Sequence, residues 1–253
     1  MCIRDRTITV TQKGQLYTDP PVIEFTDGAT NPSATAVLEQ YGVINRIDIA
    51  DGGADYSSTP TATVDAPATF SFNTFSDISG STISIPDNPF TNGLRLVYST
   101  ASGSENTNLV DGNTYYVVNS VGNSFGLANS QGGSAISLSQ SADDTSAESH
   151  SLTGVTATVT LTQSGGEITG ITINDQGTLY DGNSLPSITI DEAGQTTHAT
   201  LTVFCGRSLA SISIGSRGSG YSSAPTVSIA ASPSDSTGSV SYTHLTLPTK
   251  RIV

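Results

Sequence analysis

The sequence predicts an all-β protein: an array of short-strand repeats, stacked as antiparallel three-stranded units in a prism-like or sandwich-like arrangement, with a small inserted β-domain. Three observations predict this fold class. Only 12% of the 253 residues are charged, roughly half the usual share, and Ser, Thr, Asn and Gln replace the Lys and Glu that cover exposed helices. Apolar and polar residues alternate in short runs between glycine-rich turns. No amphipathic helical stretch of useful length occurs.

One pattern of apolar residues, glycine, tyrosine and proline occurs four times. In the second copy, Ile47 and Ile49 alternate with polar residues, and Gly53, Tyr56 and Pro60 follow at fixed spacing. We name the copies one to four and call each Gly-x-x-Tyr segment a glycine–tyrosine turn. The copies occupy residues 8–25, 47–64, 171–190 and 212–229, and their turns contain Gly14 and Tyr17, Gly53 and Tyr56, Gly177 and Tyr180, and Gly218 and Tyr221.

Each position in the pattern has an expected structural role. The glycine leaves a strand where a positive φ is required, and the proline opens the next strand without donating a ladder hydrogen bond. The tyrosine ring is expected to cover the turn, with its hydroxyl reaching water or a backbone carbonyl. A ligand-binding tyrosine is the alternative, but four identical placements favour a structural one. Alternating runs rich in Ala and Thr supply the third strand of a unit, at residues 34–38, 155–161 and 199–203.

The spacing of the copies predicts an insertion. Tyr17 and Tyr56 are 39 residues apart, whereas Tyr56 and Tyr180 are 124 apart. Subtracting one period of about 40 leaves an insertion of about 84 residues with turn signals of its own. We therefore expect copies one and two in residues 7–67, a hosted β-domain in 68–153 with its ends close together, and copies three and four in 154–239.

Both ends of the chain resemble translated sequencing adaptor. Residues 1–6 (MCIRDR) match one adaptor strand, and VSYTHLTLPT within residues 240–253 matches the complementary strand. We expect both segments to be non-native and the rest to be a metagenomic fragment of a longer reading frame. The formal net charge is −13; without the two ends, 5 basic and 21 acidic residues remain. This excess argues against a nucleic-acid partner, and no apolar run is long enough for membrane insertion.

The repeat resembles the GGxGY-type β-repeats in virion structural proteins of tailed marine phages. Residues 218–227, GSGYSSAPTV, carry the resemblance most fully, and the segment Asp111-Gly112-Asn113-Thr114-Tyr115-Tyr116-Val117-Val118 with Phe125-Gly126-Leu127-Ala128 resembles a phage-associated β-module. Copies one and three depart from the family, with Gln15-Leu16 and Thr178-Leu179 where it prefers Ser-Gly.

The resemblance implies a non-enzymatic virion structural segment, in a tail fibre, another appendage or a baseplate-associated protein, that serves assembly or host attachment. Its implied location is the virion, assembled in the host cytoplasm. Its implied partners are other virion proteins and further copies of itself, a trimer by analogy. One alternative is a carbohydrate-binding module on a phage fibre that recognises host surface glycan; the other is an extracellular bacterial adhesin. The candidate glycan contacts are Tyr98, Tyr115, Tyr116 and Phe125. Alternation leaves at most about half of these rings exposed, because Tyr115 and Tyr116 must face opposite ways.

The sequence offers no catalytic residues and no expected cofactor. A glycosidase needs two facing carboxylates, but Asp51, Asp55, Asp175 and Asp181 stand beside glycines, where aspartate is a common turn residue. Calcium on the loop from Asp51 to Asp55 is the minor alternative. Besides these acids, the chemically reactive residues are few: His150 and His198 are too scattered for a zinc site, and Cys205 is a lone cysteine at an expected hairpin turn.

Overall fold

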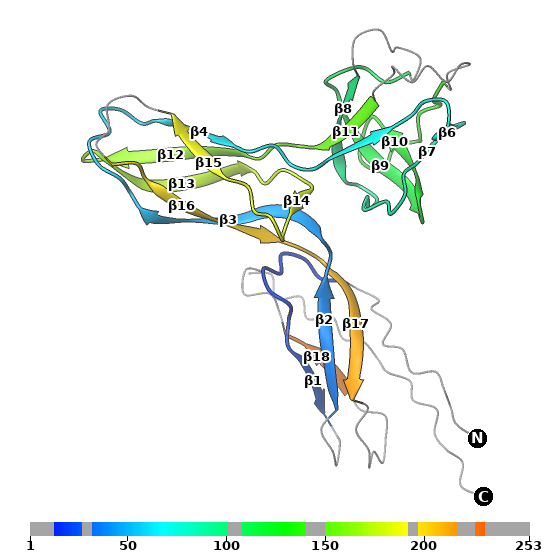
Figure 1. The fold of residues 1–253 in the computed structure, drawn as a ribbon, viewed down its shortest axis with the longest axis horizontal. Coiled ribbons are helices and arrows are strands. Elements are labelled where there is room, and N and C mark those ends of the chain that lie inside the picture. The colour runs from blue at the N-terminus through cyan, green and yellow to red at the C-terminus, as the bar shows by residue number, and fades with distance from the viewer. Residues whose placement is uncertain are drawn as a thin grey trace, which may run out of the picture. The chain divides into compact units, whose positions relative to one another are not determined.

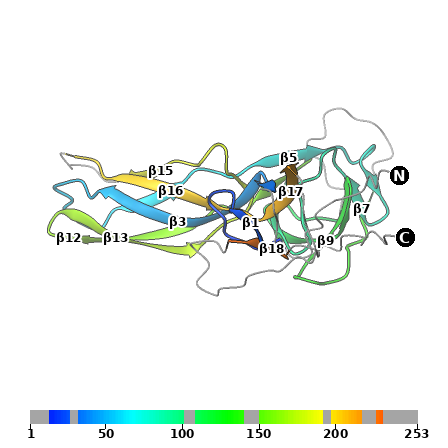
Figure 2. The same cartoon turned by 90° about the horizontal axis from the view of Figure 1, so that it is seen from below.

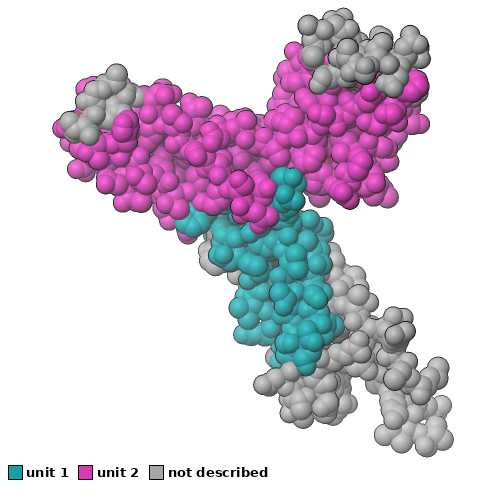
Figure 3. Space-filling view, in the orientation of Figure 1, with its two compact units in different colours: residues 1–45, 204–253 teal, residues 46–203 magenta. Residues whose placement is uncertain are grey.

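The computed structural model describes residues 13–26, 32–100, 108–139, 150–191, 197–216 and 226–230. These ranges contain strands, turns and bends and no helix, so the predicted all-β class is confirmed (Figure 1). The chain divides into two compact units, residues 1–45 with 204–253 and residues 46–203 (Figure 3). Both adaptor-like ends lie outside the described residues, as do Gly218 and Tyr221 of copy four.

The first unit contains two two-stranded ribbons that join copy one to copy four. Strand β1 (Ile23–Thr26) pairs antiparallel with β18 (Thr226–Ile229), and β2 (Ser33–Leu38) pairs with β17 (Leu209–Ser216). Alternation along β2 buries every second side chain near its end. The buried core combines both ribbons with the tyrosine of copy one: Tyr17, Ala36, Leu38, Leu209, Ile212 and Ile229.

The second unit contains the strands of copies two and three. Strand β4 (Thr61–Val64) pairs with β15 (Ile188–Asp191), and β12 (Thr158–Ser164) pairs with β13 (Glu167–Asp175). A third sheet has the order β14 (Tyr180–Asp181), β3 (Tyr41–Asp51), β16 (Thr200–Gly206). Figure 2 shows these long ribbons running alongside one another. Their shared core is Tyr56, Leu161 and Ile168, with the partly buried Ile49, Ala62, Ile171, Ile190 and Ala199.

The strand pairing differs from the stacked three-stranded units that the repeat predicts. Apart from the β12–β13 hairpin, the paired strands of the repeats come from different copies: one with four, and two with three. The reason is that all copies carry the same alternating pattern. A strand of one copy therefore buries its apolar face equally well against any other copy, and the period alone does not specify the partner.

A seven-stranded sheet lies between Thr69 and Gly154, and we call it the guest sheet. Its first and last strands along the chain, β5 (Thr69–Phe72) and β11 (His150–Gly154), are paired neighbours, and the Oγ1 atoms of Thr69 and Thr153 lie 2.8 Å apart. The order continues through β8 (Arg95–Thr100), β9 (Thr114–Val121), β10 (Ser124–Ala128), β7 (Thr82–Ser84) and β6 (Ile78–Ser79). The guest sheet belongs to the second compact unit together with copies two and three. Its independence as a domain with bounds at 68 and 153 therefore stays a prediction.

An aromatic cluster fills the guest sheet's interior. Phe90 meets Phe70 and Phe125 edge to face, with ring centroids 5.1 and 4.8 Å apart. Such arrangements add stability beyond the apolar area that they bury. The largest fully buried side chains of the sheet include Tyr98, Phe125, Leu96, Leu127, Ile83 and Leu152.

Candidate functional site

The glycine–tyrosine turns have one backbone geometry in the three copies that the structure describes at these positions. The glycine has a positive φ, of 61°, 68° and 64° at Gly14, Gly53 and Gly177. The residue before the tyrosine also lies in the left-handed region, which ordinary residues rarely adopt. Its φ is 62° at Leu16, 65° at Asp55 and 59° at Leu179. Sequence reasoning missed this second position, although the copy-four segment GSGY has a glycine, Gly220, at the equivalent place.

The tyrosine ring packs directly on the glycine of its own turn. A Cβ atom added at Gly53 would lie 2.8 Å from Cε2 of Tyr56, and one added at Gly177 would lie 2.7 Å from Cε2 of Tyr180. The rings are buried, because Tyr17, Tyr56 and Tyr180 are only 7%, 3% and 1% exposed. A buried ring offers no face to a ligand, so the structural role of these tyrosines fits the geometry better than ligand binding.

The tyrosine hydroxyls of copies two and three bind the backbone of distant strands. The amide of Ala199 donates to the hydroxyl of Tyr56 at 2.8 Å, and the amide of Ala157 donates to that of Tyr180 at 2.8 Å. The Tyr180 hydroxyl also donates to the carbonyl of Asp65 at 3.3 Å. The expectation of water or a carbonyl as partner was therefore incomplete: the principal bond is one that the hydroxyl accepts.

The backbone around each tyrosine joins further segments to the turn. The amide of Tyr56 donates to the carbonyl of Gly166 at 3.0 Å, and the side-chain amide of Gln163 donates to the carbonyl of Tyr56. In copy one, Tyr17 and Arg207 exchange two backbone hydrogen bonds of 2.9 Å each. A glycine–tyrosine turn is thus a place where segments far apart in the chain are fastened together.

Three of the four candidate carboxylates accept hydrogen bonds from backbone amides of their own turns. Asp51 and Asp175 occupy the same place in copies two and three, two residues before the glycine, and each accepts a 2.9 Å hydrogen bond from that glycine's amide. Asp181 accepts from the amide of Asn183 in the same way. Asp55 is the exposed left-handed residue of its turn. These aspartates are turn-forming residues.

The calcium alternative needs oxygens of the loop from Asp51 to Asp55 as ligands. One of them, Oδ1 of Asp51, instead accepts a hydrogen bond from the Gly53 amide. Within the described ranges, no group of three or more His, Cys, Asp or Glu side chains is arranged to hold a metal ion. Likewise, no helix in the described part of the chain meets the length and hydropathy that crossing a membrane requires.

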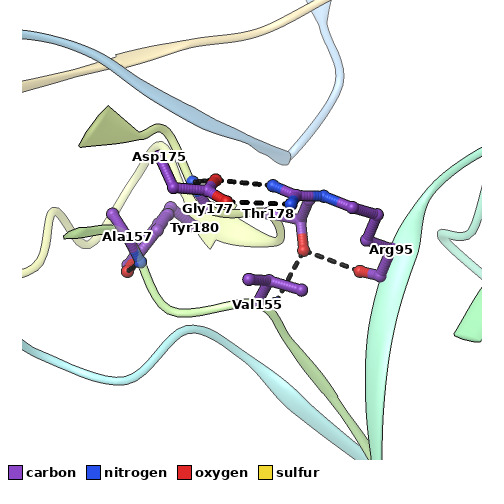
Figure 4. A network of polar contacts seen from close by, with 7 residues as sticks. All are labelled: Arg95, Val155, Ala157, Asp175, Gly177, Thr178 and Tyr180. Carbon is purple, nitrogen blue, oxygen red and sulfur yellow. Dashed lines mark hydrogen bonds and ion pairs between the residues drawn. The ribbon is translucent and has the colours of Figure 1, made fainter. Parts of the chain in front are cut away.

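Asp175 also forms an ion pair, whereas Asp51, its counterpart in copy two, belongs to none of the ion pairs among the described residues. Arg95, the first residue of β8 in the guest sheet, forms a two-pronged pair with Asp175: Nη1 to Oδ2 at 2.8 Å and Nη2 to Oδ1 at 2.5 Å (Figure 4). Hydrogen bonding from Arg95 is the main cause that lowers the pKa of Asp175, with a smaller contribution from the Gly177 amide, while partial burial opposes the shift. The same hydrogen bond raises the pKa of Arg95.

Thr178 completes the polar network at this turn. Its hydroxyl accepts from the amide of Val155 at 2.8 Å and donates to the carbonyl of Arg95 at 2.8 Å (Figure 4). The only sequence signal for this contact was Thr178-Leu179 at the place where copy four has Ser219-Gly220. Arg95 carried no signal, because a single arginine in a run of alternating residues does not reveal its partner.

Three of the four candidate glycan contacts are buried. Tyr98 and Phe125 are 0% exposed and Tyr115 is 3% exposed, so their rings cannot stack on a sugar. Tyr98 instead bonds Nδ1 of the buried His150 at 2.6 Å with the rings stacked, and the Tyr115 hydroxyl accepts from the Val110 amide. Large rings on the inner face of a sheet fill its core, and only Tyr116, on the opposite face of β9, is half-buried.

The remaining reactive residues are dispersed. His150 lies in the core of the guest sheet, His198 is exposed just before β16, and Cys205 is a buried free cysteine near the end of that strand. Comparison with family models, with curated proteins and with solved structures finds no match.

Proposed function

We propose that this chain is a non-enzymatic structural segment of a tailed-phage virion, in a tail fibre, another appendage or a baseplate-associated protein, where it serves assembly or host attachment. The observation that supports the proposal is the recurrence of one glycine–tyrosine turn that fastens segments far apart in sequence. A catalytic protein concentrates its special geometry at one site, whereas here the same geometry recurs along the chain.

The turns suit a scaffold because each one couples the opening of one ribbon to that of another. Pulling β16 away from its neighbours breaks the bond from Ala199 to Tyr56 and uncovers a ring that is 3% exposed. Burying a tyrosine ring stabilises a fold by roughly 2 kcal/mol, and losing one partner of a buried hydrogen bond costs about 1–3 kcal/mol. Several such turns in one chain resist local opening, and an appendage exposed to proteases needs this resistance.

The proposal is tested by locating the protein. Virus particles from the sample that carries the gene are purified on a density gradient, and peptides from residues 32–100 and 150–191 are quantified in each fraction by mass spectrometry. We expect these peptides to co-sediment with the phage major capsid protein at a fixed ratio. Their recovery in the bacterial outer-surface fraction, without capsid, would refute the virion assignment and favour the adhesin alternative.

Host attachment has a separate test, because three of the four candidate aromatic residues, Tyr98, Tyr115 and Phe125, are buried. The purified chain is applied to cells of a susceptible host, and bound protein is measured with and without enzymatic removal of surface glycan. Binding that glycan removal abolishes would support a carbohydrate-binding function at another surface. Absence of binding leaves assembly as the role that the proposal retains.

A further inference from the structure

The turns of copies two and three differ at the places where the guest sheet contacts copy three. Both turns have the aspartate cap and the buried tyrosine, at Asp51 and Tyr56 in one copy and at Asp175 and Tyr180 in the other. The residue after the glycine is Ala54 in copy two and Thr178 in copy three. The backbone amides of Ala54 and Thr178 each donate to a carbonyl of a neighbouring segment, at 3.0 and 2.9 Å. Thr178 differs because its hydroxyl also donates to the carbonyl of Arg95.

Both chain connections of the guest sheet also meet the copy-three turn. On entry, the amide of Ala68 donates to the carbonyl of Leu179 at 3.1 Å. On exit, the amide of Gly154 donates to the carbonyl of Ala68 at 3.1 Å, and that of Val155 donates to the Thr178 hydroxyl at 2.8 Å. The two connections lie side by side, as the pairing of β5 with β11 requires. If these two connections were the only attachment, they would act as a hinge. The guest sheet could then rotate about the line through them without breaking the hydrogen-bond ladder of any β-sheet.

Contacts of Arg95 oppose such a rotation. Arg95 lies on β8, which is separated from the entry strand β5 by β11 in the sheet order. Its guanidinium bonds Asp175 through two nitrogens, and its carbonyl accepts from Thr178. A two-pronged arginine–carboxylate pair fixes orientation as well as distance. The turn therefore holds the guest sheet at a third place, on the strand next to the exit connection, where Leu96 pairs with Gly154.

We propose that Arg95, with Asp175 and Thr178, is a positioning device that fixes the orientation of the guest sheet on the copy-three turn. When these contacts are broken, the guest sheet remains folded and rotates about residues 65–68 and 154–157. The glycine–tyrosine turn of copy three is thus specialised to carry a projecting module, whereas that of copy two fastens ribbons of the repeat. This inference does not depend on the virion assignment.

The test measures a distance between the guest sheet and the repeat in the full chain. Spin labels are attached at Val121→Cys, in the guest sheet and 80% exposed, and at Thr172→Cys, exposed on β13. Cys2→Ser removes one of the two thiols of the chain, and the buried Cys205 is checked for non-labelling by mass. Pulsed electron paramagnetic resonance then gives the distance distribution. We expect a narrow distribution in the parent and at least a twofold broader one in Arg95→Gln and in Thr178→Ala.

Two matched variants serve as controls. Arg46→Gln removes the same charge from the exposed pair of Arg46 with Asp48, whose Nε–Oδ1 distance is 3.2 Å, and Ala54→Thr adds to copy two the hydroxyl that copy three has. Neither should broaden the distribution. Hydrogen exchange of β9 and β10 reports whether the guest sheet stays folded in every variant. Unchanged widths in both test variants, or equal broadening in Arg46→Gln, would refute the proposal.

A third variant keeps the test decisive if either substitution unfolds the guest sheet. Asp175→Asn retains an oxygen for the Gly177 amide, because the asparagine carbonyl accepts the same bond, but it removes the charge and the Oδ2 acceptor of Arg95 Nη1. We expect this variant to broaden the distribution too. In the unmutated protein, 1 M salt should also broaden the distance distribution, because it screens the partly exposed ion pair of Arg95 and Asp175. A distribution that neither Asp175→Asn nor salt broadens would show that the backbone connections alone fix the orientation.

Discussion

Removing the hydroxyl of Tyr180 tests the fastening role of the glycine–tyrosine turns most directly. In Tyr180→Phe the ring still covers Gly177, so packing is preserved, but two hydrogen bonds disappear. The Ala157 amide, on a residue only 3% exposed, loses its acceptor at 2.8 Å, and the Asp65 carbonyl loses a weaker donor at 3.3 Å. A buried amide left unsatisfied costs about 1–3 kcal/mol, so we expect the free energy of unfolding to fall by roughly 2 kcal/mol.

The assay is urea unfolding of the full chain, followed by tyrosine fluorescence, together with hydrogen exchange at the Ala157 amide. The midpoint should fall with little change in the denaturant slope, and exchange at Ala157 should accelerate more than exchange in β1, which belongs to the other compact unit. Tyr56→Phe is the matched comparison, because its hydroxyl has the same 2.8 Å bond to a backbone amide, that of the less buried Ala199. We expect it to cost about 1 kcal/mol. If Tyr180→Phe lowers stability by less than about 0.3 kcal/mol, water replaces the hydroxyl freely and the fastening argument fails.

Three further predictions concern the backbone and the ion pair of the turns. Gly177→Ala should destabilise the chain by at least about 2 kcal/mol in urea unfolding, because the new methyl group adds a clash with the Tyr180 ring to the strain of φ +64°. Gly80→Ala is the control: its φ is +62° but its surroundings are open, so it should cost only about 1 kcal/mol of left-handed strain. Asp55→Gly should exceed Asp55→Ala in unfolding free energy by about 1 kcal/mol, since Asp55 is exposed and lies at φ +65°; equal values would contradict the left-handed assignment. Folding lowers the pKa of Asp175, so its pair with Arg95 contributes fully above the unfolded value of about 3.9 and is lost as pH falls through the lower folded value. The difference in urea midpoint between the parent and Asp175→Asn should therefore be constant well above about pH 4 and shrink as the pH falls below it; a difference that stays constant in acid would contradict this.

The all-β class was predictable because it depends on short-range properties that every strand shares. Alternation, glycine-rich turns and scarce charge act over a few residues, and each is visible in the sequence. The positive φ at the glycine was predictable for the same reason, because a residue that leaves a strand in the left-handed region is usually glycine. Gly14, Gly53 and Gly177 all have it. Properties that one copy determines by itself are thus readable from that copy.

The partner of each strand was not predictable, because the copies are too similar. Ile212 of copy four faces Ala36 after copy one, and Ile190 of copy three faces Ala62 of copy two. Exchanging one copy for another would bury almost the same side chains, so the hydrophobic pattern does not select the pairing. The same limit explains why the sequence did not show which candidate glycan contacts are buried. An aromatic residue such as Tyr98, Tyr115 or Phe125 looks the same in the sequence whether its ring faces the core or solvent. The face of the sheet on which the ring lies determines whether it is buried.

Departures from the repeat carried the information that the shared pattern lacked. In copy two, Ala54 joins its turn to a neighbouring segment through the backbone alone, because its amide donates to the carbonyl of Thr197 at 3.0 Å. At the equivalent place Thr178 bonds both Val155 and Arg95. Leu179 keeps a strained left-handed backbone while its side chain is 2% exposed and its carbonyl binds the entry to the guest sheet. A glycine there would relieve the strain but remove the buried side chain. All three described turns carry such a left-handed residue, at Leu16, Asp55 and Leu179, so the feature that distinguishes copy three is the Thr178 hydroxyl and its bond to the guest sheet.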